Sequence, residues 1–284
     1  MTSLGKWQWL TIAGGAILMA SLFFVNRKSP DKPTQMPAAA RDSASSRLNF
    51  DSLITQAESQ LTGWAKTKIA SYNKALPAAG TAVQAQLYDS IAKVYDSLGL
   101  QLQADYYLEK NAALLKSAST WTRAGEGYFD IALLMNPAVK GVVLQRALNC
   151  FTQALSVDSA SPDAKVGMGQ CIVESGQDPM KGIGIIQGVL QKDSNNFKAQ
   201  LALGEFSMES GQYPKAIGRF SKILKLSPAY IKAYLYLAEA YERTGDKKTA
   251  VACLKKYSTF ATDTSLKRQV EEYIAKFESE SNKQ

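Results

Sequence analysis

The chain has 284 residues, of which 46% are hydrophobic and 20% are charged, and its formal net charge is +8. This is the composition of a protein that can bury a core, which excludes a wholly disordered chain. The sequence has no histidine, the commonest general base and metal ligand, and its three cysteines lack the CxxC spacing of zinc and redox sites. We therefore expect no metal and no other cofactor.

Half of the positive charge lies near the amino terminus. Residues 1–41 contribute +4 of the +8, since Lys6, Arg27, Lys28, Lys32 and Arg41 stand against one acidic residue. Basic residues in this arrangement flank an apolar segment, where they are expected for membrane orientation. No basic stripe with interleaved aromatic residues follows, so a nucleic-acid partner is not expected.

A short tail, residues 1–6, precedes an apolar segment at residues 7–25, WQWLTIAGGAILMASLFFV. The segment has no charged residue, and a helix of this length, at about 1.5 Å per residue, matches the hydrocarbon core of a bilayer. Trp7 and Trp9 at one end and Arg27 at the other resemble interfacial anchors. We expect a transmembrane anchor.

Two properties of this segment stay open. A cleaved signal peptide is the alternative, although the best small-residue cleavage motif, Ala38 to Ala40, lies well beyond the apolar run. The basic residues on the two sides nearly balance, so the orientation is undetermined. Ala16 and Ala20 form one small-xxx-small pair, which leaves oligomerisation open.

Residues 26–46 are rich in Pro, Ser and Ala and predict a flexible linker. In residues 47–84 the apolar side chains recur at intervals of three and four, as in Leu53, Ile54 and Ala57. This spacing predicts helices that lead into the folded part.

A repeat of 34 residues follows. Residues 197–228 and 231–257 correspond at this offset, which pairs Leu203 with Leu237, Ala216 with Ala250 and Phe220 with Leu254. A fixed period of this length is typical of proteins built from repeated supersecondary units.

The period and its residues resemble the tetratricopeptide repeat. The first of these copies meets that family's pattern at Leu203, Gly204, Tyr213, Ala216, Phe220 and Pro228. The resemblance implies an all-α fold, a right-handed superhelical solenoid of helix pairs. Weaker copies at residues 85–117, 118–159 and 162–196 bring the number to about five, within a solenoid that we place at residues 85–264. We expect a capping helix and tail at residues 265–284.

Two of the weaker copies depart from the pattern. Residues 136–143, NPAVKGVV, lengthen the copy at 118–159, and we predict that they enlarge the turn between its two helices. The second helix of the next copy, residues 180–192, contains three glycines, which are expected to weaken it.

The resemblance implies that the first helices of the repeats line a concave binding surface. The Lys and Asn residues with which one subset of the family binds a carboxylate tail are absent here, since Leu201, Leu235, Glu205 and Glu239 occupy those places in two copies. Our candidate partner-binding residues are Glu174, Leu201, Glu205, Met208, Glu209, Leu235, Glu239 and Glu242. They predict an acidic, partly apolar groove for a basic or amphipathic segment of a protein partner. The alternative is that these glutamates are solvated helix formers.

The sequence lacks a GxSxG motif and a phosphate-binding loop, so we do not expect an enzyme. We expect a membrane-tethered interaction scaffold or assembly factor. The alternative is a structural subunit of a cell-envelope complex whose solenoid packs on itself or on another subunit. The layout resembles that of membrane-anchored bacterial repeat proteins. This resemblance implies the inner membrane, with the folded part leaning towards the outer side.

Overall fold

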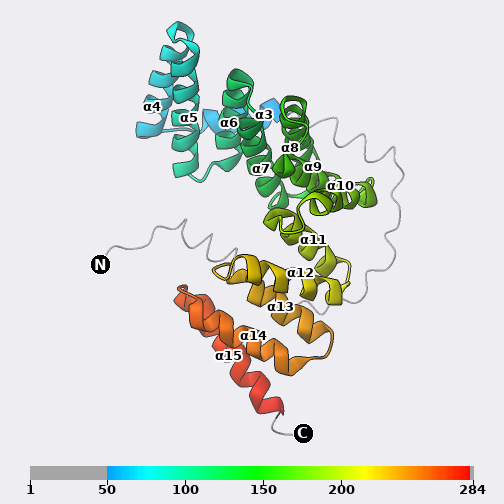
Figure 1. The fold of residues 1–284 in the computed structure, drawn as a ribbon. Coiled ribbons are helices and arrows are strands. Elements are labelled where there is room, and N and C mark those ends of the chain that lie inside the picture. The colour runs from blue at the N-terminus through cyan, green and yellow to red at the C-terminus, as the bar shows by residue number, and fades with distance from the viewer. Residues whose placement is uncertain (1–49, 282–284) are drawn as a thin grey trace. The chain divides into compact units, whose positions relative to one another are not determined.

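The computed structural model describes residues 50–281, and this part is built of helices and turns without a strand (Figure 1). It divides into two compact units, and the boundary between them in the sequence falls between Ala147 and Leu148. The expected anchor at residues 7–25 and linker at 26–46 lie outside the described residues. Among the helices within 50–281, none has the length and apolar character that a membrane span requires.

The first unit begins with the expected helical lead-in. Its helices are α3 (Phe50–Ser59), α4 (Gly63–Ala75), the 3₁₀ turn Leu76–Ala78, α5 (Thr81–Ser97), α6 (Gln101–Leu115) and α7 (Ala118–Leu133). Helix α5 packs against α6, α6 against α7, and α3 against α6. The first repeat helix thus begins at Thr81, four residues before the predicted start.

The core of the first unit is aromatic. Tyr95 and Tyr107 are buried and stack with ring centroids 5.5 Å apart. Ile91 and Ala92 on α5 and Ala104 on α6 complete the cluster. Small and large side chains alternate across these two helices, so the helices can approach each other closely.

The predicted enlarged turn at residues 136–143 is wrong. Helix α8 spans Pro137–Val157, so the additional residues form the start of a 21-residue helix. Pro137 occupies the first turn, where its missing N–H needs no partner. The side-chain oxygen of Asn136 accepts hydrogen bonds from the N–H groups of Ala138 and Val139, at 3.1 and 3.2 Å. The sequence thus carries a helix start where the repeat period suggested a loop.

The second unit contains three helix pairs and a final helix. They are α9 (Pro162–Ser175) with α10 (Pro179–Lys192), α11 (Phe197–Glu209) with α12 (Tyr213–Leu226), α13 (Lys232–Arg243) with α14 (Lys247–Phe260), and α15 (Thr264–Ser281). Gly211 and Gly245, 34 residues apart, have φ of 71° and 86° and end α11 and α13. This left-handed conformation favours glycine, which explains the repeated residue.

Glycine also permits the closest approach of α9 and α10. A methyl group on Gly169 would lie 2.8 Å from the carbonyl oxygen of Gly182 and 2.5 Å from the side chain of Ile186. Gly182 is buried. The glycines predicted to weaken α10 therefore leave it continuous over Pro179–Lys192, and one of them forms the contact with α9.

Candidate functional site

The eight candidate residues lie on the first helices of three successive pairs in the second unit. Glu174 is on α9; Leu201, Glu205, Met208 and Glu209 are on α11; Leu235, Glu239 and Glu242 are on α13. Glu209 is exposed and the other seven are partly buried. The 34-residue period places Glu205 and Glu239 at the same position of adjacent repeats.

The apolar members of this set belong partly to the core. Leu201 and Met208 pack against the buried cluster that contains Phe220, Ile223 and Leu237. Their side chains are only partly accessible. They can offer a partner a limited apolar area.

Two of the glutamates accept hydrogen bonds from tyrosines of a later helix. The hydroxyl of Tyr236 donates to Glu205 Oε1 at 2.9 Å, and that of Tyr273 donates to Glu242 Oε1 at 2.7 Å. Both pairs are 31 residues apart in sequence, so each joins α11 to α13 or α13 to α15. Burial, with the nearby charge of Glu205, raises the pKa of Tyr236, so its hydroxyl remains a donor.

Sequence reasoning missed these tyrosines because the helical period alone does not show which side chains meet between repeats. The repeated spacing of 31 residues between Glu and Tyr is the signal that could have found them. Glu239 forms an ion pair with Arg243, with 3.8 Å between charged atoms, and its side chain is 13% exposed. The carboxylates of Glu205, Glu239 and Glu242, which we predicted to bind a partner, thus already have contacts within the unit.

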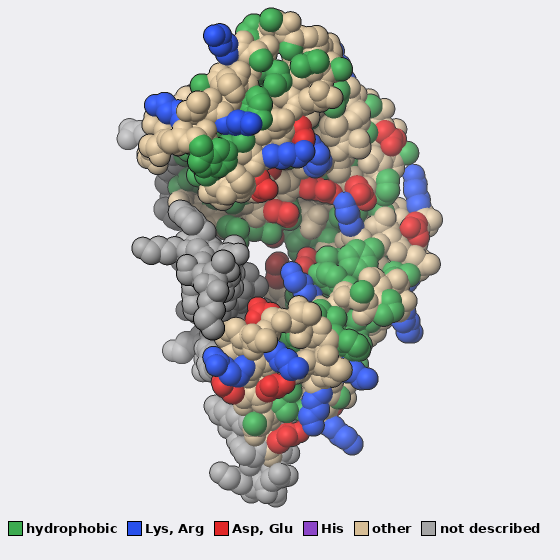
Figure 2. Space-filling model, turned by 90° about the vertical axis from the view of Figure 1, so that its left-hand side faces the viewer, with side chains coloured by type: hydrophobic (Ala, Val, Ile, Leu, Met, Phe, Trp, Pro, Cys, Tyr) green, Lys and Arg blue, Asp and Glu red, His purple; other side chains and the backbone are tan. Residues whose placement is uncertain are grey.

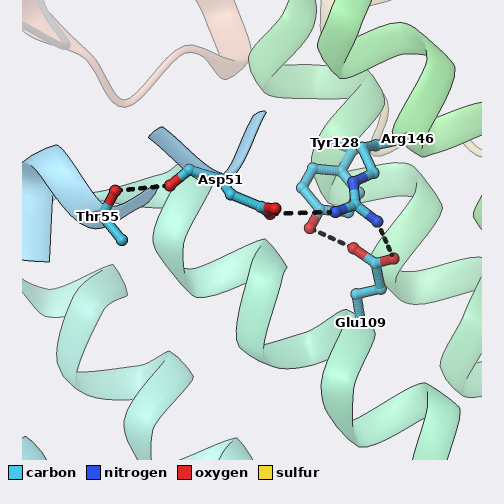
Figure 3. Close-up of polar contacts among 5 residues, drawn as sticks. All are labelled: Asp51, Thr55, Glu109, Tyr128 and Arg146. Carbon is cyan, nitrogen blue, oxygen red and sulfur yellow. Dashed lines mark hydrogen bonds and ion pairs between the residues drawn. The ribbon is translucent and has the colours of Figure 1, made fainter. Parts of the chain in front are cut away.

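A second polar cluster, also missed, lies in the first unit (Figure 3). Glu109 on α6 accepts a hydrogen bond from the hydroxyl of Tyr128 on α7 at 2.7 Å and from Arg146 on α8 at 3.0 Å. Arg146 also lies 3.8 Å from Asp51 on α3. Its guanidinium sits 4.4 Å from the centre of the Phe50 ring. The cluster thus joins α3 to three repeat helices.

A third cluster surrounds Glu58, the last acidic residue of α3. Its Oε1 accepts hydrogen bonds from Tyr107 at 3.1 Å and from Tyr95 at 3.4 Å. Burial and the charge of Glu58 raise the pKa of both tyrosines, so both hydroxyls are protonated. Tyr107 also borders a cavity of about 200 Å³ next to α3. The carboxylate serves here to hold α3 on the repeats.

Charges of both signs share the molecular surface. On the face drawn in Figure 2, Asp and Glu side chains lie close to Lys and Arg side chains. Ion pairs within the described chain include that of Asp163 with Lys198 at 2.8 Å. This face is therefore neither uniformly acidic nor uniformly basic.

Comparison with known proteins gives matches to part of the chain. The family model described as "Regulator of microtubule dynamics protein 1-3" matches residues 198–281, less than a third of the chain. Superkiller protein 3 of Schizosaccharomyces pombe is 24% identical over 191 residues, which are 61% of this chain and 13% of that protein. The chain thus spans about an eighth of the length of this relative.

The solved structure of PilW shows a similar arrangement of helices. PilW, described as a widely conserved type IV pilus biogenesis factor, has a TM-score of 0.53 at 20% identity, over 69% of this chain and 86% of its own. YrrB, described as a tetratricopeptide-repeat protein with an unusual peptide-binding site, is 19% identical with a TM-score of 0.41, over 71% of this chain and 97% of its own.

Successive pairs of packed helices, each ended by a short turn, define a helical repeat protein. The 34-residue period, the small residues at the helix contacts and the similarity to PilW show that the chain has a tetratricopeptide-repeat fold.

Proposed function

We propose that the protein is a membrane-tethered interaction scaffold that holds a basic or amphipathic segment of a partner protein on α9, α11 and α13. The observation that carries this proposal is the repetition of one surface in adjacent repeats. Glu205 with Leu201 on α11 and Glu239 with Leu235 on α13 occupy equivalent positions and are all partly exposed. A segment that crosses both helices would meet the same pair of side chains twice.

The chemistry of this surface favours cations beside apolar groups. A carboxylate offers about four lone-pair sites. At Glu205 one of these sites accepts the hydrogen bond from the hydroxyl of Tyr236. Lys or Arg of a partner would add charge-assisted hydrogen bonds there, while Leu201 and Leu235 would contact its apolar side chains. Attraction between the charges would act mainly on the association rate, which makes binding sensitive to salt.

Residues 7–25 would hold this scaffold in the inner membrane, with the folded part on the outer side. An uncharged run of this length flanked by Trp, Lys and Arg supports the proposal. Membranes that contain the full chain, extracted with alkaline carbonate, should retain it. A chain that lacks residues 1–46 should be released, and equal release of both chains would contradict the anchor.

The binding proposal is tested with the full chain in detergent micelles. Two fluorescent amphipathic peptides share one apolar stripe and carry either Lys or Glu beside it. The Lys peptide should bind, and Glu205→Lys with Glu239→Lys should weaken that binding about tenfold and abolish its salt dependence. The control variant is Glu272→Lys, because that side chain is 71% exposed on α15. Equal binding to wild type and the double variant would reject this surface.

A further inference from the structure

One face of the second helix differs strongly among four of the helix pairs, those that end in α6, α10, α12 and α14. Each of these helices has one small residue that meets the first helix of its pair: Ala104 on α6, Gly182 on α10, Ala216 on α12 and Ala250 on α14. We define the outer face as the residues two, three and six places after that small residue. The outer face comprises Tyr106, Tyr107 and Lys110 on α6; Gly184, Ile185 and Gly188 on α10; Gly218, Arg219 and Lys222 on α12; and Ala252, Cys253 and Lys256 on α14.

On α6 the outer face is covered by a helix of the chain itself. The ring of Phe50 on α3 lies 6.3 Å from that of Tyr106, and Glu58 accepts the hydrogen bond from Tyr107. The acidic side chain of Asp51 points towards Arg146 at the edge of this contact (Figure 3). Helix α3 thus shows what this face can accept, namely a short amphipathic helix with carboxylates beside its apolar side chains.

On α10 the outer face is apolar and open. Methyl groups added to Gly184 or Gly188 would meet no other atom within 4 Å. At the place of Gly188, helices α12 and α14 carry Lys222 and Lys256, which suit a solvated surface. The uncharged outer face of α10 is therefore a departure from its own repeat pattern.

This face lines a groove of about 550 Å³ within the second unit. Leu155 on α8, Met168 on α9 and Val189 on α10 supply further apolar walls. Lys165 and Lys192 also line it, and neither forms an ion pair within the described chain. One carboxylate, that of Asp193, also lines the groove, and its Oδ1 accepts a hydrogen bond from the N–H of Asn195 at 2.9 Å.

We propose that this groove binds an amphipathic helix of a partner protein whose apolar side chains are flanked by carboxylates. Three observations support the occupant: the glycines allow close approach of a helix, the walls are apolar, and the lysines complement acidic side chains. The groove uses α8, α9 and the outer face of α10. It is distinct from the acidic surface of α9, α11 and α13, and its partner carries the opposite charge.

The test uses the full chain and two stapled helical peptides of about 14 residues, because free peptides of that length are marginally helical. Both carry the same leucine stripe, flanked by Glu in one and by Lys in the other. Fluorescence anisotropy should show that the Glu peptide binds. Gly188→Gln, which fills the groove without adding charge, should weaken the affinity for this peptide about tenfold. The control Gly218→Gln, at a glycine in open space on the outer face of α12, should leave binding unchanged.

A charge reversal tests the lysines. Lys192→Glu, in the last turn of α10, should weaken binding of the Glu peptide. Lys225→Glu, in the last turn of α12, should have little effect on that binding. The proposal is overturned if the Glu peptide does not bind, or if its binding survives Gly188→Gln. If Glu205→Lys with Glu239→Lys abolishes binding of the Lys peptide, that result concerns only the acidic surface of α9, α11 and α13. The two proposals can therefore fail separately.

Discussion

The carboxyl group of Asp105 on α6 lies directly against the α-carbon of Gly127 on α7, in the space that a larger residue's side chain would occupy. Asp105 is fully buried. Its Oδ1 accepts a hydrogen bond from Gln101 at 3.1 Å, while its Oδ2 has no hydrogen-bond partner within the described structure. A polar group therefore stands where the repeat contact would ordinarily be apolar.

We expect Gly127→Ala to destabilise the first unit, because the added methyl group would collide with Asp105. Overpacking of this kind costs about 1–3 kcal/mol. Urea denaturation followed by circular dichroism measures the change. In the double variant Asp105→Ala with Gly127→Ala, the collision is gone and the cost of the second substitution should largely disappear. Additive effects would show that the two residues do not compete for the same space.

The same carboxyl group predicts a dependence of stability on pH. Burial, with charge from Asp130 and Asp96, raises the pKa of Asp105 from 3.8 to about 7. The folded state then binds more protons than the unfolded state between these values, so stability falls as pH rises from about 4 to 7. Asp105→Asn should remove this slope and stabilise the protein at pH 8 by an amount on the order of a few kcal/mol. Melting temperatures of both proteins between pH 5 and 8 test this, and parallel curves would contradict it.

A matched pair of substitutions tests the contact between α9 and α10. Gly169→Ala would place a methyl group against Ile186 and the Gly182 carbonyl, and we expect a loss of about 1–3 kcal/mol. Gly184→Ala, in open space on α10, should instead stabilise by about 0.5–1 kcal/mol because alanine favours a helix. Urea midpoints that move in the same direction for both variants would refute the close approach.

The cluster around Arg146 contains one buried contact and one exposed contact, so the contributions of the two to stability can be compared. Glu109→Ala would leave the buried Tyr128 hydroxyl without its acceptor and should cost about 1–3 kcal/mol. Asp51→Ala removes a 3.8 Å pair in which Asp51 is 69% exposed, and should change stability by less than about 1 kcal/mol. Denaturation curves of the two variants measure the difference. Equal losses would show that the position of α3 depends on the exposed pair.

The repeats were predictable because their signal is steric and periodic. Leu203 and Ala216 recur 34 residues later, Phe220 is matched there by another large apolar residue, Leu254, and α11 to α14 follow that period. The start of α8 was not predicted, since Asn136 and Pro137 can begin a helix as well as form a turn, and the repeat pattern favoured the turn. The local hydrogen bonds to Asn136 accompany the helix.

The helices that hold the candidate residues were predictable, but the contacts of those residues were not. The period placed Glu205 and Glu239 on successive first helices, where the structure has them. It could not show that Tyr236 reaches Glu205, because side-chain contacts between repeats depend on how the helices pack. In the sequence, two glycines of the outer face of α10, Gly184 and Gly188, were interpreted only as residues that weaken the helix.

The central claim is that the protein captures a partner on the acidic surface of α9, α11 and α13. The most direct test is crosslinking in intact membranes, which compares wild type with the double variant Glu205→Lys and Glu239→Lys and with Glu205→Gln, whose amide oxygen can still accept from Tyr236. Our account predicts defined partners that crosslink to the wild type, decline with Glu205→Gln and disappear with the double reversal. Partners that crosslink equally to all three proteins would contradict it.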